Sequence, residues 1–107
     1  MAEIRFSVLA ANDLREIKVY ISDELGNEQA AHHIVEKILQ RIRTLREFPE
    51  IGAPLSAVIK FDTPYRYLVC GNYNVFYHFD HSIVQIERIL YNRRNYMQIL
   101  FGDPSDI

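Results

Sequence analysis

The chain has 107 residues, enough for one domain with a single core, and 49% of them are apolar. Its formal net charge is −2, so it lacks the basic excess with which nucleic-acid binders neutralise phosphates. The only cysteine, Cys70, excludes a disulfide within the chain. No apolar run approaches the roughly 20 residues of a membrane span, and the first residues lack the pattern of a signal peptide. We therefore predict one soluble, cytoplasmic domain over residues 1–107.

The first half of the chain predicts one strand and two helices. Apolar and polar residues alternate over 4–8, which indicates a strand with one buried face. A helical pattern covers 9–26 and ends at Gly26, and a second covers 27–48 and starts with Asn27 as its cap. The apolar positions of the two helices are Leu14, Ile17, Val19, Ile21 and Leu25, then Ala31, Ile34, Ile38, Ile42 and Leu45. The joint between the helices is short, so we expect an antiparallel hairpin whose first helix is the shorter.

The second half predicts a β-meander after a proline-rich loop. The loop covers 47–64, and strand patterns follow over 65–70, 73–79 and 83–91. Their joints are so short that the strands must be antiparallel. Strands after a pair of helices predict an α+β fold, β-α-α-β-β-β, with an antiparallel sheet and the α-helical hairpin packed on one face. The first strand would lie at an edge or beside a meander strand, and the apolar residues of 96–100 predict a short tail that packs back.

Arg88 is the least expected residue of the last predicted strand. Alternation places it on the same face as three apolar residues: Val84, Ile86 and Leu90. An arginine on such a face must be paired or must line a groove. The alternative is a β-bulge that shifts the register and turns Arg88 outward. The sequence leaves both explanations open.

The stretch YNRRNY, residues 91–96, holds the main functional candidates. Arginine presents a fork of donors suited to phosphate or carboxylate, and a nearby phenol can stack on a base or form a hydrogen bond. The bland alternative is that one arginine pairs with an acid of the hairpin and the other is solvated. The histidines are not spaced for a metal site, so we predict no metal and no cofactor. A metal-free enzyme could still cleave RNA, whose 2′-hydroxyl is an internal nucleophile.

Three segments, in this order, resemble the RelE/ParE superfamily of bacterial toxins. The family's first helix is similar to AANDLREIKVYIS at 10–22, and its Leu-x-x-x-Pro-x-x-Gly segment is similar to LREFPEIGAP at 45–54. Its three closing strands with an Arg-Arg exit are similar to residues 65–96. The resemblance covers nearly the whole chain. It implies the toxin of a type II toxin–antitoxin module, which inhibits growth, stabilises plasmids and is neutralised by an antitoxin.

The superfamily has two activities on one scaffold, so the fold does not decide between them. RelE-like members cut mRNA in the ribosome with Arg, Lys and Tyr side chains, whereas ParE-like members poison DNA gyrase and are not nucleases. Asn74 stands where the mRNA-cutting relatives place a catalytic Arg, and a neutral amide cannot supply that charge. The resemblance therefore favours a gyrase poison that is not an enzyme. The alternative is a metal-independent, ribosome-dependent mRNA endoribonuclease with a reduced centre of Arg66, Arg93 and Tyr96, and a third option is a member that has lost toxicity.

The resemblance also implies the partners. These are a cognate antitoxin and DNA gyrase, or the ribosome and mRNA in the alternative, with no membrane and with a toxin dimer inside a heterotetramer as one assembly to consider. The residues predicted to contact the target or the antitoxin are Arg66, Arg88, Tyr91, Arg93, Arg94 and Tyr96.

Overall fold

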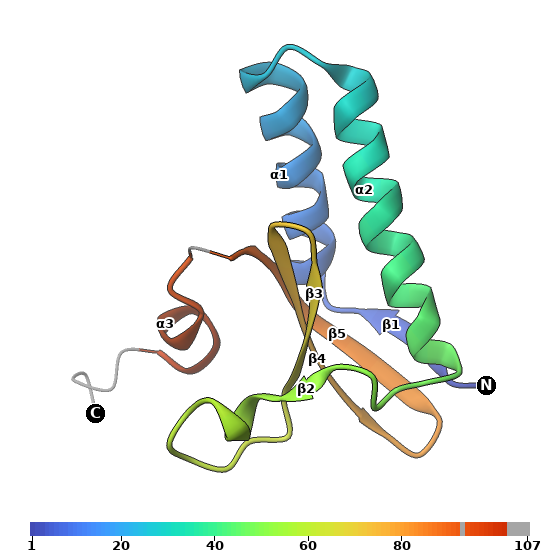
Figure 1. Cartoon of the computed structure of the whole chain (residues 1–107), viewed down its shortest axis with the longest axis vertical. Coiled ribbons are helices and arrows are strands. Elements are labelled where there is room, and N and C mark those ends of the chain that lie inside the picture. The colour runs from blue at the N-terminus through green and yellow to red at the C-terminus, as the bar shows by residue number, and fades with distance from the viewer. Residues whose placement is uncertain (93, 103–107) are drawn as a thin grey trace.

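The computed structural model describes residues 1–92 and 94–102 of the chain. A hairpin of two long helices stands above a twisted sheet, and a short helix, α3, lies away from the hairpin (Figure 1). The elements are β1 Glu3–Phe6, α1 Val8–Glu24, α2 Glu28–Arg43, the 3₁₀ turn η1 Thr44–Arg46, β2 Ala53–Pro54, the 3₁₀ turn η2 Leu55–Ala57, β3 Arg66–Cys70, β4 Tyr73–Asp80, β5 Ile83–Tyr91 and α3 Tyr96–Phe101. No helix in the described ranges has both the length and the apolar character needed to cross a bilayer.

The predicted helical hairpin forms, but its helices are almost equal in length. Ser7 and Asn27 are the N-caps, and each side chain accepts a hydrogen bond from a backbone N–H of the first turn, at 2.9 and 3.0 Å. Gly26 joins the helices with a φ of +61°, a conformation that glycine adopts without strain. The expectation of a shorter first helix is wrong, because α1 has 17 residues and α2 has 16. Ser7 starts α1 directly after β1, and a 3₁₀ turn over 44–46 ends α2 early.

The sheet has five strands in the order β1-β5-β4-β3-β2. The meander β3–β4–β5 is antiparallel, as the short turns predict, and β2 is a two-residue strand inside the proline-rich loop. The α+β class and the position of the hairpin on one sheet face are confirmed. The sheet is mixed rather than wholly antiparallel, because the edge strand β1 runs parallel to β5. Parallel pairing is possible here because the hairpin and the meander separate β1 from β5 in the sequence.

A β-bulge at Glu87 decides which side chains of β5 face the hairpin. Phe76 of β4 is opposite Arg88, whereas the next residue of β4 is opposite Ile86, so Glu87 has no partner of its own. The sequence predicts one shared face for Val84, Ile86, Arg88 and Leu90. That prediction is wrong for the last two, because one extra residue exchanges the faces of all that follow. Ile89 takes the place on the hairpin face instead.

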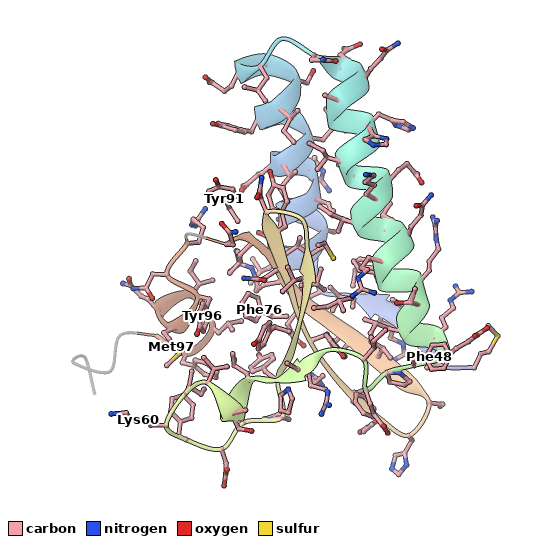
Figure 2. The ribbon with its side chains drawn as sticks, in the orientation of Figure 1. Phe48, Lys60, Phe76, Tyr91, Tyr96 and Met97 are labelled. Carbon is pink, nitrogen blue, oxygen red and sulfur yellow. The ribbon has the colours of Figure 1, made fainter. Side chains whose placement is uncertain are left out.

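The two faces of the sheet carry two separate apolar clusters. The larger lies under the hairpin and includes Ile17, Ile21, Ile38, Ile42, Leu45, Leu68, Val75, Tyr77, Val84, Ile86 and Ile89. The smaller lies on the opposite face and is built on Leu55, Phe76 and Leu90. Helix α3 covers the smaller cluster, so the prediction of a tail that packs back is confirmed. In Figure 2 the side chain of Tyr96 lies beside that of Phe76.

Candidate functional site

Tyr91 and Arg94 lie at the rim of one groove between α1 and the ends of β4 and β5. We call it the tyrosine groove; it has a volume of about 640 Å³, and its polar residues are Asp13, Glu16, Tyr20, Asn72, Tyr73, Tyr91 and Arg94. The rings of Tyr73 and Tyr91 meet edge to face with 5.7 Å between centroids. Burial, together with the neighbouring phenols, raises the pKa of Tyr73, so its hydroxyl remains a neutral donor. Buried isoleucines of α1 and β5 form the floor, so the groove combines an apolar base with a polar rim.

Arg88 is held by a carboxylate of α1. Its Nε donates to Asp13 Oδ2 at 2.8 Å and its Nη2 donates to Asp13 Oδ1 at 2.9 Å. The hydrogen bonds to Asp13, together with the negative charges nearby, raise the pKa of Arg88 against the opposing effect of burial. Asp13 also accepts a hydrogen bond from the backbone N–H of Ile89 at 2.9 Å. The expectation that Arg88 is paired is therefore confirmed, and the bulge that the sequence offers as its alternative is also present.

Arg66 holds the loop that precedes β2. Its guanidinium donates to the carbonyl oxygens of Gly52 at 3.1 Å and Glu50 at 3.3 Å, and it lies 5.9 Å from the ring centroid of Phe79. Tyr77, opposite Arg66 in the ladder, acts on the same loop. Its hydroxyl donates to the carbonyl of Pro49 at 2.6 Å and accepts from the N–H of Gly52 at 2.9 Å. These bonds explain physically why a glycine follows the proline at this spacing, since a Cβ on Gly52 would lie 2.6 Å from the Tyr77 hydroxyl.

Tyr96 is the first residue of α3, and its ring stacks on that of Phe76. The two centroids are 5.3 Å apart with 29° between the ring planes. At the other end of α3, Phe101 meets Phe61 and Tyr65 edge to face, with centroids 5.0 and 5.7 Å away. Tyr96 therefore belongs to the small cluster that fixes α3 on the sheet.

The structure does not bring the predicted residues into one site. Arg66 is opposite Tyr77 and shares the hairpin face with it. Tyr96 stacks on Phe76, and the side chain of Phe76 points to the other face of the sheet. Asn74 lies on the same face as Phe76 and is partly buried. Among the predicted residues that the structure describes, only Tyr91 and Arg94 line a common groove. Arg93 lies outside the described residues.

Sequence reasoning missed Asp13, which organises the edge of β5. Asp13 is 7% exposed and lies between Ala10 and Ile17 at helical spacing. Ala10 and Ile17 are also buried. An acid inside a buried helical stripe needs a partner, and that pattern could have pointed to Arg88. Reasoning from the sequence also missed the contact of His78 Nε2 with Glu87 Oε1 at 3.0 Å. The two residues are diagonal neighbours across β4 and β5, because His78 is opposite Gln85. Within the described ranges, no three His, Cys, Asp or Glu side chains come together in a way that could hold a metal ion.

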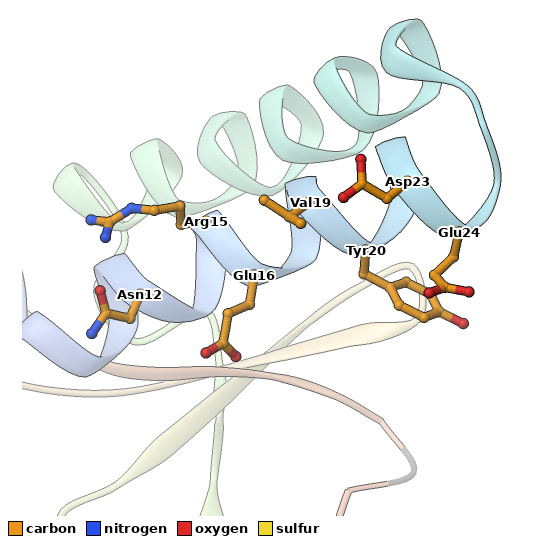
Figure 3. Close-up of a pocket in the computed structure, with 7 residues that line it drawn as sticks. All are labelled: Asn12, Arg15, Glu16, Val19, Tyr20, Asp23 and Glu24. Carbon is orange, nitrogen blue, oxygen red and sulfur yellow. The ribbon is translucent and has the colours of Figure 1, made fainter.

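The exposed side of α1 is mostly acidic. A surface hollow of about 460 Å³ lies there, and it shares Glu16 and Tyr20 with the tyrosine groove. Three acids and one base line it: Glu16, Asp23, Glu24 and Arg15. Figure 3 shows Glu16 and Tyr20 pointing from α1 toward the strands. The α1 side of the molecule therefore offers phenols and carboxylates to a partner.

Comparison with known proteins gives both a family and a fold. Residues 4–96 match the family model described as the ParE toxin of the type II toxin–antitoxin system parDE. The solved structure of a chromosomal ParDE toxin–antitoxin system from P. aeruginosa is similar over 85% of this chain and 96% of that one, with 20% identity and a TM-score of 0.70. At that identity the similarity supports the fold.

Two structures of YafQ from E. coli are more distant. One is a mutant form with 15% identity and a TM-score of 0.48, and the other has 18% identity and a TM-score of 0.47. Both alignments cover 95% of this chain and 100% of the other. Among curated proteins, no sequence matches the chain. Because the family model spans most of its length, the chain belongs to the ParE family, the toxins of type II toxin–antitoxin systems.

Proposed function

We propose that this toxin stops growth by binding DNA gyrase in the cytoplasm, that it does not cleave RNA, and that Tyr91 and Arg94 contact the target. The family assignment makes the chain a toxin with an antitoxin partner. The choice of gyrase over the ribosome rests on the placement of the residues that a nuclease would need. The whole chain, residues 1–107, would act as one domain.

One observation carries this choice: Arg66 and Tyr96 are on opposite faces of the sheet. A cutting centre needs its cations and its proton carrier around one phosphate, within hydrogen-bond reach. The guanidinium of Arg66 is bonded to the carbonyls of Glu50 and Gly52, and the ring of Tyr96 is stacked on Phe76. Asn74 supplies no charge on either side. This arrangement supports a protein that binds its target rather than one that cuts RNA.

Tyr91 and Arg94 support a binding role because both are exposed. Tyr91 is 41% exposed and stands at the end of β5, where Figure 2 shows its side chain near α1. Aromatic and arginine side chains around an apolar floor are the residues that dominate binding energies at protein interfaces. Arg66 and Arg88 already have partners within the chain, so we expect their contribution to be structural.

Parallel measurements of gyrase activity and RNA cleavage test this proposal. The purified toxin should inhibit supercoiling of a relaxed plasmid by gyrase, and it should leave mRNA intact in a translating extract. In bacteria without the antitoxin, incorporation of labelled thymidine should stop before incorporation of labelled methionine. Position-specific cuts in translated mRNA, with supercoiling unaffected, would instead establish the endoribonuclease.

A charge reversal at the rim of the tyrosine groove tests the contact residues. Arg94→Glu should weaken inhibition of gyrase by about tenfold or more, because charged rim residues steer and orient a complex. Lys18→Glu is the matched control, since Lys18 is exposed on α1 and makes the same change in net charge. Equal inhibition by the two variants would remove Arg94 from the site. Size-exclusion chromatography of the toxin with its antitoxin would show whether a toxin dimer exists within a heterotetramer.

A further inference from the structure

The tyrosine groove contains three phenols from three different elements. Tyr20 lies on α1, Tyr73 begins β4 and Tyr91 ends β5. The rings of Tyr73 and Tyr91 meet edge to face, and the pKa of Tyr73 is raised first by burial and then by Tyr91 and Tyr20, so the three phenols are close together. The side chains of Tyr20 and Tyr91 are 59% and 41% exposed, which leaves both open to a partner. Aromatic rings attract cations to their faces.

A carboxylate without an ionic partner stands beside these phenols. Glu16 lines the tyrosine groove, and Figure 3 shows its side chain and that of Tyr20 pointing from α1 toward the strands. Asp13, one turn earlier on α1, is bonded to Arg88. Glu16 adds to the negative charge that raises the pKa of Arg88, but the hydrogen bonds of that arginine go to Asp13. Among the described residues, no ion pair joins Glu16 to a base, so its charge remains available to a ligand.

The charges around Glu16 favour a cation over an anion. The hollow that adjoins the groove on α1 adds two acids and one base: Asp23, Glu24 and Arg15. Like charges across an interface are costly, so an acidic side chain would be repelled from this end of the groove. Arg94 lies at the rim, and no ion pair within the described residues joins it to Glu16. The groove therefore offers a negative charge and a positive charge at separate points.

We propose that the tyrosine groove holds a lysine or arginine side chain of the target protein, on a segment whose neighbouring residues are apolar. This inference rests on the proposed function, which supplies a target at this groove, and it adds the chemistry that the target must present. The cationic head lies between the phenols and the carboxylate of Glu16. The apolar neighbours cover the buried floor at Ile17, Ile21 and Ile89, and Arg94 meets an oxygen acceptor of the same segment.

Two short peptides test the chemistry without any part of gyrase. One is a blocked pentapeptide with an arginine and a lysine between leucines, and the other has glutamates in place of both cations. The chain contains no tryptophan, so its intrinsic fluorescence reports its tyrosines. The cationic peptide should change this fluorescence to saturation and bind roughly tenfold or more tightly than the acidic one at low salt. Equal binding of the two, or binding of neither at millimolar concentration, would overturn the proposal.

Substitutions in the intact toxin place the cation. Glu16→Gln should weaken the cationic peptide by about tenfold at low salt, and added salt should narrow the difference from wild type. Glu47→Gln is the matched control, because Glu47 is exposed and lines neither the groove nor the hollow. Equal weakening by the two variants would show a general charge effect and would overturn the site.

The ring of Tyr91 provides a second, independent test. Tyr91→Leu removes the aromatic face and should weaken the cationic peptide roughly tenfold, whereas Tyr91→Phe keeps the ring and should weaken it by about threefold or less. An equal loss in the two variants would assign the effect to the hydroxyl and contradict a cation on the ring. Far-ultraviolet circular dichroism checks that each variant is folded.

The same variants separate this inference from the gyrase proposal. Inhibition of supercoiling should weaken in Glu16→Gln and should be relieved by the cationic peptide but not by the acidic one. If the cationic peptide binds through Glu16 while the wild-type toxin does not inhibit gyrase, the choice of gyrase is wrong and the cation site stands. If Glu16→Gln weakens binding of the antitoxin and leaves inhibition of gyrase unchanged, the groove belongs to the antitoxin and the inference is wrong.

Discussion

Two strands of the sheet, β5 and β3, are longer than the edge strands that pair with them. Their unpaired backbone groups have different surroundings. At β5, the edge strand β1 pairs with Ile83–Ile86, and residues of α1 and its cap satisfy the backbone beyond that point. Ser7 donates through its N–H to the carbonyl of Ile86 at 2.9 Å and through its hydroxyl to the carbonyl of Glu87 at 2.7 Å. Asp13 then accepts from the N–H of Ile89 at 2.9 Å.

At β3, no such substitute is present in the described residues. The edge strand β2 stops after pairing with Tyr67 and Arg66, and a groove lined by Lys37 and Arg41 lies between α2 and β3. At β5 the side chains of Ser7 and Asp13 bond to the backbone that β1 leaves unpaired, although this requires a largely buried ion pair. An unpaired strand edge is a template for another strand, so the two edges differ in what they leave available for pairing.

The largest expected effect is a loss of stability at the edge of β5 that Asp13 covers. Asp13→Asn removes the charge that compensates Arg88, whose side chain is only 20% exposed, and we expect a loss of about 3 kcal/mol of unfolding free energy. Urea denaturation measures it. Asp23→Asn, at an exposed position of the same helix, is the control and should cost almost nothing. A similar small loss for both variants would show that the ion pair does not hold α1 on β5.

A second substitution tests how Gly52 fixes the start of the short strand β2. Gly52→Ala places a methyl group 2.6 Å from the Tyr77 hydroxyl and 2.7 Å from the carbonyl oxygen of Tyr67, so the chain entering β2 must shift. We expect a loss of roughly 2 kcal/mol in thermal or urea unfolding.

Gly71→Ala serves as the comparison for that variant. Gly71 has a φ of +59° and open space around its Cβ position, so its substitution adds backbone strain alone, at about 1 kcal/mol. If the two variants lose equal stability, crowding at Gly52 is not what fixes the start of β2.

Ser7→Ala is expected to have a smaller effect at the edge of β5. The variant loses the cap of α1 and the hydrogen bond to the carbonyl of Glu87, while the backbone bond from Ser7 to Ile86 remains. We expect about 1 kcal/mol of destabilisation by urea unfolding. Ser7→Thr should recover most of it, since threonine also caps helices; failure to recover would point to crowding at β5 rather than capping.

The smallest expected effect concerns the thiol of Cys70, the last residue of β3. Burial raises the pKa of Cys70 to about 11, from an ordinary value of 9.0. Because the thiolate is the reactive form, alkylation of the folded protein should keep accelerating up to a pH of about 11. The unfolded chain ionises first, so this group contributes stability below pH 9.0 that is lost as the pH rises toward 11. A midpoint near 9.0 in the folded protein would mean that the thiol is open to water.

Local patterns were sufficient for the hairpin and the meander. Asn27 and Gly26 act only on neighbouring residues, so the joint between the helices follows from the sequence. The two-residue turns of the meander require antiparallel strands, because no other connection is short enough. The direction of β1 could not be predicted in this way, since parallel pairing with β5 joins residues some 80 positions apart.

The sequence by itself determined the α+β class, the resemblance to RelE/ParE toxins and the candidate residues at 91–96. Tertiary structure alone decided how those residues are used. The bulge at Glu87 depends on long-range pairing with β4, and it exchanges the faces of all later residues of β5. Pairing between distant elements also brings Arg88 to Asp13, and in the described residues β2 pairs with β3 only at Arg66 and Tyr67. Tyr96 stacks on Phe76, on the face opposite to that of Tyr77. The alternation of apolar and polar residues describes one strand by itself and carries no information about its partner strand. The bulge and these contacts therefore appear only in the folded chain.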